Sequence, residues 1–228
     1  MQQLIISVLF GWFLGVLSTI GYEQYKRYLD GKNLKTAILS ELKVLLPRLV
    51  LGYYLLIVKE GKCDKEKVQW VYDNLSLYED KTIASRITST KTKLKKLLKL
   101  DDASIKSAIA LLAGKIEVED IKSIILSFNK ESITNFSLLS EELRLIIFNI
   151  RAMINVLNEL ADRIDFFFKQ SFVPGISSNN IEIIESNIKS NYVSYLETSK
   201  LVIERIKDIF ELEKGKNSIN IKKTNQDF

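Results

Sequence analysis

Acidic side chains recur at helical spacing in the last third of the chain, where they could in principle hold a metal ion. Glu159, Asp162 and Asp165 share one expected helix, and further carboxylates follow on the next. Di-iron sites in helical bundles need Glu-x-x-His pairs, and this chain contains no histidine. Glu159 and Asp162 also fall two positions past the apolar residues Leu157 and Leu160, which indicates a solvated face. The sequence therefore predicts no metal site.

The absence of histidine also removes the usual general base for a serine or cysteine nucleophile. The phosphate-binding patterns G-x-x-x-x-G-K-[ST] and G-x-G-x-x-G do not occur, nor does the nucleophile motif G-x-S-x-G. Ser-Lys catalysis stays open on composition alone, but Ser104, Lys106 and Ser107 fit a helix surface better. We therefore expect a protein that is not an enzyme, with no catalytic residue and no cofactor.

A basic stretch, residues 81–100, is the strongest candidate for a binding surface. It carries seven basic residues and no acidic one, and Leu94, Leu97 and Leu98 lie on one side of the expected helix. A basic amphipathic helix can lie on a membrane, bind a partner, or be a solvated face over a core stripe. Nucleic acid is an unlikely partner because no aromatic residues alternate with the lysines. The expected contacts with anionic lipid headgroups are Arg86, Lys91, Lys93, Lys95, Lys96 and Lys99.

The chain begins with an apolar stretch that has the length of a membrane span. No charged residue occurs from Leu4 to Tyr22, and nineteen helical residues measure about 28 Å, close to the hydrocarbon core of a bilayer. Tyr22, Tyr25 and Tyr28 then follow as an interfacial aromatic belt would. A cleaved signal peptide is the main alternative, but no basic residue precedes the stretch and its cleavage site is poor. We expect an uncleaved, single-pass transmembrane helix.

Basic residues indicate how this helix is oriented. Lys26, Arg27, Lys32 and Lys35 follow the apolar stretch, and none precedes it. The positive-inside rule then predicts a cell-membrane protein with its N-terminus outside and its body in the cytoplasm. The single cysteine, Cys63, excludes an intramolecular disulfide and fits a reducing compartment.

Small residues occur at every fourth position of the apolar stretch: Ser7, Gly11, Gly15 and Thr19. They would form one face along four helical turns. In lipid, helices associate by close backbone approach across such faces, although glycine is also simply tolerated in membrane spans. The face predicts a homo-oligomer or pairing with another membrane helix.

The rest of the chain reads as all-α, with 46% apolar and 27% charged residues and two prolines. Residues 1–30 are the expected anchor and juxtamembrane helix, ended by a break at Gly31–Asn33. Residues 31–136 are expected to form shorter helices, with a kink at Pro47 and with N-caps at Asp64 and at Asp101–Asp102. Residues 214–228 show no periodicity and are expected to be a mobile basic tail.

Residues 137–213 carry the clearest pattern. Apolar residues alternate spacings of four and three from Leu139 to Phe167, and again from Ile181 to Ile209. Val173-Pro174-Gly175 between them is a turn. We expect a long antiparallel helical hairpin of about 50 Å, with the shorter helices packed on its wide apolar stripe.

These features predict a membrane-tethered, cytoplasmic helical interaction or scaffold module that is not an enzyme and self-associates. The alternative is a membrane-acting effector of toxin or defence type, whose oligomerised spans and basic helix perturb the bilayer. Only Ser7, Ser18 and Thr19 could form a hydrophilic stripe in the span, which favours tethering. An enzyme with an unrecognised carboxylate or Ser-Lys site is a third, weaker alternative.

Overall fold

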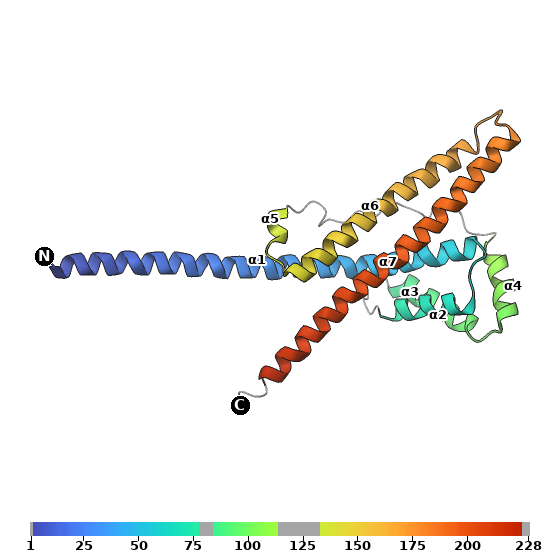
Figure 1. Cartoon of the computed structure of the whole chain (residues 1–228). Helices are drawn as coiled ribbons and strands as arrows, with labels where there is room; N and C mark the ends of the chain where they lie inside the picture. The colour runs from blue at the N-terminus through green and yellow to red at the C-terminus, as the bar shows by residue number, and fades with distance from the viewer. Residues whose placement is uncertain (1, 78–83, 114–132, 225–228) are drawn as a thin grey trace.

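The computed structural model describes residues 2–77, 84–113 and 133–224, with side chains described for these residues except 2–9, 84–86, 133–134 and 215–224. Within these ranges the regular elements are all α-helices, which confirms the predicted all-α class and helical bundle. The frame consists of three long helices: α1 (Gln2–Lys59), α6 (Glu141–Gln170) and α7 (Ser178–Thr224) (Figure 1).

The shorter helices are α2 (Lys65–Ser76), α3 (Ala84–Leu97), α4 (Asp102–Ala113) and α5 (Ile133–Phe136). Helices α2 and α4 pack on the C-terminal half of α1, and α3 packs on α2. The main cover of the α6–α7 hairpin is α1, which lies against α7. The expectation that the helices of residues 31–136 would pack on the hairpin is thus confirmed for the C-terminal half of α1. In addition, the Lys200 ammonium of α7 lies 6.0 Å from the centre of the Trp70 ring of α2.

Helix α1 is unbroken over 58 residues, so the predicted break at Gly31–Asn33 is wrong. Gly31 is buried, and a Cβ atom placed on it would lie 2.9 Å from the carbonyl oxygen of Leu138. The glycine therefore allows close packing between α1 and the segment before α6. The helix also continues through Pro47, which is buried among core leucines whose packing offsets the lost backbone hydrogen bond.

The two halves of α1 differ in their surroundings. From Ile38 to Val58 the helix supplies a large part of the core. From Phe10 to Tyr28 its side chains are exposed. Figure 1 shows this N-terminal half as a rod that projects from the bundle. Burial of one half holds the other half in a fixed direction.

The predicted hairpin is confirmed. Helices α6 and α7 pack along each other, with Ile150, Leu157 and Ile164 of α6 buried. The turn between them contains Gly175 with φ of +83°, a conformation that L side chains rarely adopt. Helix α7 continues to Thr224, so residues 214–224 are helical rather than irregular. A single glycine at 215 weakens a helix by about 1 kcal/mol but does not end one that is already nucleated.

The predicted N-caps are also confirmed. The Asp64 carboxylate accepts a hydrogen bond from the backbone N–H of Lys67 at 2.8 Å and starts α2. The Asp101 carboxylate accepts one from the N–H of Ser104 at 2.8 Å and starts α4. Trp70 of α2 packs on Tyr53 of α1, with ring centroids 4.9 Å apart.

Candidate functional site

The exposed N-terminal half of α1 is the main candidate site. Trp12, Phe13 and Leu14 are 68%, 54% and 53% exposed. Three consecutive helical residues point in directions about 100° apart, so together they sample every side of the helix. Further large apolar side chains along this half are exposed as well: Phe10, Val16, Leu17 and Ile20. No side of this segment is covered by the described part of the chain.

A helix that is apolar all round is normally buried in a protein core or in a membrane. Contiguous exposed apolar surface in a folded protein usually marks an interaction site. The described residues of the body leave this half of α1 uncovered. The segment is therefore the candidate contact surface of the described part of the chain.

Among the residues that the structure describes, no helix contains a stretch that is both long and apolar enough to cross a membrane. The transmembrane helix predicted over Leu4–Tyr22 is not supported by this finding. The side chains of residues 1–9, with which that predicted span begins, are not among those described.

The predicted small-residue face lies partly in the described region. A Cβ atom added at Gly11 or Gly15 would meet nothing within 4 Å, so both positions are open. The Thr19 hydroxyl donates a hydrogen bond to the Gly15 carbonyl oxygen at 2.9 Å. Its polar group is therefore satisfied within the helix and does not need water or a partner. The side chain of Ser7 lies outside the described residues.

The predicted basic surface is on α3 and at its end. Leu94 is fully buried, whereas Lys93, Lys95 and Lys96 are exposed. Lys99, just after the helix, is exposed, Lys91 is half-buried, and the Arg86 side chain lies outside the described residues. Helix α3 therefore buries an apolar stripe in the core and presents a basic face to solvent. The structure brings the lysines together but places α3 beside the C-terminal half of α1, away from the projecting N-terminal rod (Figure 1).

A second basic region, which the sequence analysis used only for orientation, follows the exposed apolar segment. Tyr22, Tyr25 and Tyr28 are more than 60% exposed, and Lys26 and Arg27 between them are exposed too. Further along α1, Lys35 forms an ion pair with Glu213 of α7. This contact brings the C-terminal part of α7 next to the base of the projecting rod.

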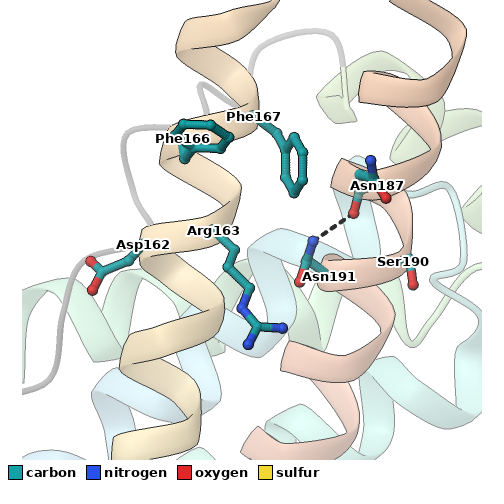
Figure 2. A pocket seen from close by; sticks show the side chains of 7 residues that line it. All are labelled: Asp162, Arg163, Phe166, Phe167, Asn187, Ser190 and Asn191. Atoms are coloured by element: carbon teal, nitrogen blue, oxygen red, sulfur yellow. Dashed lines mark hydrogen bonds between the residues drawn. The ribbon is translucent and has the colours of Figure 1, made fainter. Parts of the chain in front are cut away.

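An open groove of about 640 Å³ lies between α6 and α7. In Figure 2, Arg163 and Phe167 extend toward α7, whereas Asp162 points away from it. The Asn191 side-chain amide donates to the Asn187 backbone carbonyl at 2.7 Å and is thereby occupied within its own helix. Sequence analysis missed this groove. The sequence signal for this groove was a pair of polar residues, Asn187 directly before Ile188 of the apolar pattern and Asn191 three residues after it.

The carboxylates considered first lie where the sequence predicted. Glu159, Asp162 and Asp165 are exposed, and Asp165 pairs with Lys169 at 2.6 Å. In the described part of the chain, no group of three His, Cys, Asp or Glu side chains could hold a metal ion.

Cys63 is the one thiol of the chain, and it is buried. Burial, together with the nearby negative charge of Asp64, raises the pKa of its thiol to about 11. The reactive thiolate is therefore scarce near neutral pH. Cys63 acts as a small core residue.

The chain matches no protein-family model, and no curated protein or solved structure is significantly similar to it.

Proposed function

We propose that this protein is a membrane-tethered helical interaction module, held in the cell membrane by the N-terminal half of α1. The observation that carries the proposal is the exposure of Trp12, Phe13 and Leu14 on all sides of a rod that the body does not cover. Water is a poor solvent for such a helix, and lipid is the surrounding that suits apolar side chains in every direction.

The residues that follow fit the same assignment. Exposed tyrosines at 22, 25 and 28 are placed where an aromatic belt would meet the membrane interface. Lys26, Arg27 and Lys32 come next and are exposed, and under the positive-inside rule they support a body on the cytoplasmic side. The order of apolar, aromatic and basic residues along one straight helix supports a cytoplasmic module with a single anchor.

The body would act by contact with other proteins rather than by catalysis. Because α1 passes from the rod into the core without a break, any association of the rods would be transmitted to the bundle as a fixed arrangement. Gly11 and Gly15 leave one side of the rod open for close approach, which supports self-association in the bilayer.

The tethering is tested by cell fractionation of the full-length protein. The double variant Leu14→Lys/Leu17→Lys places two charges in the exposed apolar segment, at a cost of about 2.5–3.5 kcal/mol each in a membrane centre. We expect wild type in the carbonate-resistant membrane fraction and the variant largely outside it. Leu111→Lys is the matched control, because Leu111 is equally apolar and 76% exposed but lies on α4.

A wild-type protein that is fully extracted by carbonate would overturn the proposal. So would a double variant that remains in the membrane fraction to the same extent as Leu111→Lys.

Self-association is tested by the mass of the detergent-solubilised protein. Gly11→Ile/Gly15→Ile should reduce an oligomer to a monomer, because the added side chains hold the helices apart. Gly21→Ile is the control, since Gly21 is equally open but lies about 120° around the helix from Gly15. Equal masses for the two variants would remove the glycine face from the proposal.

The same cells can be assayed for membrane potential during expression. We expect it to be preserved, because Thr19 uses its hydroxyl within the helix and offers no hydrophilic surface. A loss of potential that disappears in Gly11→Ile/Gly15→Ile would replace the scaffold by a membrane-acting effector.

A further inference from the structure

The groove between α6 and α7 lies in the part of the hairpin next to its turn. On the α6 side it is lined by two consecutive aromatic residues, Phe166 and Phe167, with ring centroids 5.4 Å apart. On the α7 side the lining side chains are short and polar, among them Asn187 and Ser190. Short side chains do not fill the space opposite aromatic ones, and a volume of about 640 Å³ remains open. This volume is within the range of ligand-binding sites, about 300–1,000 Å³.

Arg163 is the basic residue among the described residues that line the groove. Its side chain is exposed and extends toward α7 (Figure 2). Within the described part of the chain it forms no ion pair, since Asp162 points away from α7 and Asp165 pairs with Lys169. A guanidinium presents five N–H donors in a planar fork that matches the two oxygens of a carboxylate. The groove therefore places a free carboxylate-binding group beside two aromatic rings.

Helix α7 adds groups that can bond to a peptide backbone. The Asn191 amide already donates to the Asn187 backbone carbonyl oxygen at 2.7 Å. The Asn187 side chain and the Ser190 hydroxyl, by contrast, make no hydrogen bond to any described residue. Amide and hydroxyl side chains both donate and accept hydrogen bonds, so they can pair with the N–H and C=O groups of an extended segment.

Exposed apolar side chains continue on the hairpin beside this open groove. Phe166 is 55% exposed, and Ile183, one helical turn before Asn187 on the same face, is 51% exposed. A small molecule in an open groove would keep much of its surface in water, whereas sites for such ligands bury most of the ligand. A peptide that crosses the groove can also cover the neighbouring apolar side chains. The shape of the site therefore favours a peptide segment over a small molecule.

We propose that the α6–α7 groove binds an extended segment of a partner protein in which one Asp or Glu is next to an aromatic or large aliphatic residue. Arg163 binds the carboxylate of this segment, and Phe166 and Phe167 pack against its apolar side chain. One acidic residue is favoured over a run of them, because the nearby carboxylates of Asp162 and Glu159 repel further negative charge.

This inference deepens the proposed function, because it rests on a body that acts by contact with other proteins and names the chemistry of the partner. It does not depend on the membrane tether, since the groove belongs to the hairpin and not to α1.

The test begins with a phage-displayed library of random peptides, which is selected on the detergent-solubilised full-length protein. Parallel selections use Arg163→Gln and the control Arg205→Gln, which removes the same charge from an exposed position on α7 outside the groove. We expect wild type and Arg205→Gln to enrich peptides with one Asp or Glu beside an aromatic or large aliphatic residue. Arg163→Gln should not enrich them.

A synthetic copy of the most enriched peptide is then titrated by fluorescence anisotropy. Arg163→Gln should weaken its binding by about tenfold or more, the usual contribution of a hydrogen bond to a charged group. Arg205→Gln should leave the affinity unchanged. In Arg163→Glu, binding should be lost and should return when the acidic residue of the peptide is replaced by lysine, which shows that the two charges meet directly.

The apolar part of the site is tested by two matched aromatic substitutions. Phe166→Ala should weaken binding of the same peptide, whereas Phe172→Ala should not. Phe172 is a close control because it is 70% exposed and packs edge-to-face on Phe168, as Phe166 does on Phe167, but it does not line the groove. Equal effects of the two substitutions would overturn the assignment of the groove.

The inference would also be rejected if the selection enriched no acidic peptides, or if the enriched peptide bound Arg163→Gln as tightly as wild type. A wild-type oligomer that dissociates in Arg163→Gln would assign the groove to a second copy of the chain instead. Carbonate extraction of the same proteins separates this outcome from failure of the tether. If wild type leaves the membrane but still binds the peptide through Arg163, the tether is wrong and the groove stands. If it stays in the membrane and selects no acidic peptide, only the groove is rejected.

Discussion

Gly31 of α1 lies directly against the backbone of Leu138, so closely that a Cβ atom on the glycine would come within 2.9 Å of the Leu138 carbonyl oxygen. Backbone cannot move aside as a flexible side chain can. The contact therefore connects the base of the projecting rod to the segment that leads into α6. It explains why glycine occurs at this helical position.

We predict that Gly31→Ala lowers the free energy of unfolding by about 1–3 kcal/mol, the usual cost of overpacking. Gly52→Ala, in the same helix, should instead raise it by up to about 1 kcal/mol, since Gly52 has nothing within 4 Å and alanine favours the helix. Urea unfolding of both variants in one detergent measures the difference. Equal effects for the two substitutions would mean that the close approach at Leu138 does not exist in solution.

Ser199 of α7 is fully buried, and its hydroxyl has no hydrogen-bond partner among the described residues. Leaving a buried hydroxyl unpaired costs about 1–3 kcal/mol. We predict that Ser199→Ala stabilises the protein by about 1 kcal/mol more than Ser107→Ala does. Ser107 is a fair control because it is helical and exposed and donates to the Ala103 carbonyl oxygen at 3.1 Å. A thermal shift no larger than that of Ser107→Ala would indicate that the Ser199 hydroxyl is satisfied.

Asp64 caps α2, and the contribution of this N-cap to the free energy of unfolding can be measured. Asp64→Ala is expected to lower the free energy of unfolding by about 1 kcal/mol, whereas Asp64→Asn, which also caps, should lose less. The pKa of the Asp64 carboxyl is set by two opposing effects. Partial burial raises it, but hydrogen bonds from the Lys67 side chain and backbone outweigh burial and hold the pKa below its usual range.

The cap of Asp64 therefore stabilises the fold fully above the pKa of the unfolded carboxyl, about 3.9. Its contribution disappears as the pH falls through the lower pKa of the folded state. The stability difference between wild type and Asp64→Ala, measured by circular dichroism, should shrink below about pH 4. A difference that stays constant down to pH 2 would rule out the ionised carboxylate as the cap.

The reactivity of the Cys63 thiol at alkaline pH tests whether this side chain is buried in the core. Its thiol pKa of about 11 in the folded protein lies above the ordinary value of 9.0. The folded state thus favours the neutral thiol, and this contribution is complete below pH 9 and is lost as the pH rises through 11. Iodoacetamide should modify the folded protein at pH 8 about 100-fold more slowly than the urea-unfolded protein. A folded-state rate profile with its midpoint near pH 9 would contradict the buried position.

Local patterns in the sequence were sufficient for much of the fold. The hairpin follows from apolar residues three and four apart and from the Pro174–Gly175 turn, and the caps at Asp64 and Asp101 follow from side chains that bond backbone groups three residues away. These features depend on neighbours along the chain. The apolar segment that contains Gly11, Trp12 and Gly15 could likewise be recognised from the sequence, because no charged residue interrupts it.

The tertiary structure decided how the helices pack against one another. A glycine such as Gly31 can break a helix or admit a neighbour, and only its contact with Leu138, more than a hundred residues away, distinguishes the two. The direction of α7 along α1 likewise depends on the pairs Lys59–Tyr192 and Lys35–Glu213. Long-range contacts of this kind leave no periodic signal, because the two partners share no spacing along the chain. The sequence alone therefore predicted the hairpin and the helix caps, whereas packing decided that α1 continues through Gly31 and how α7 lies against it.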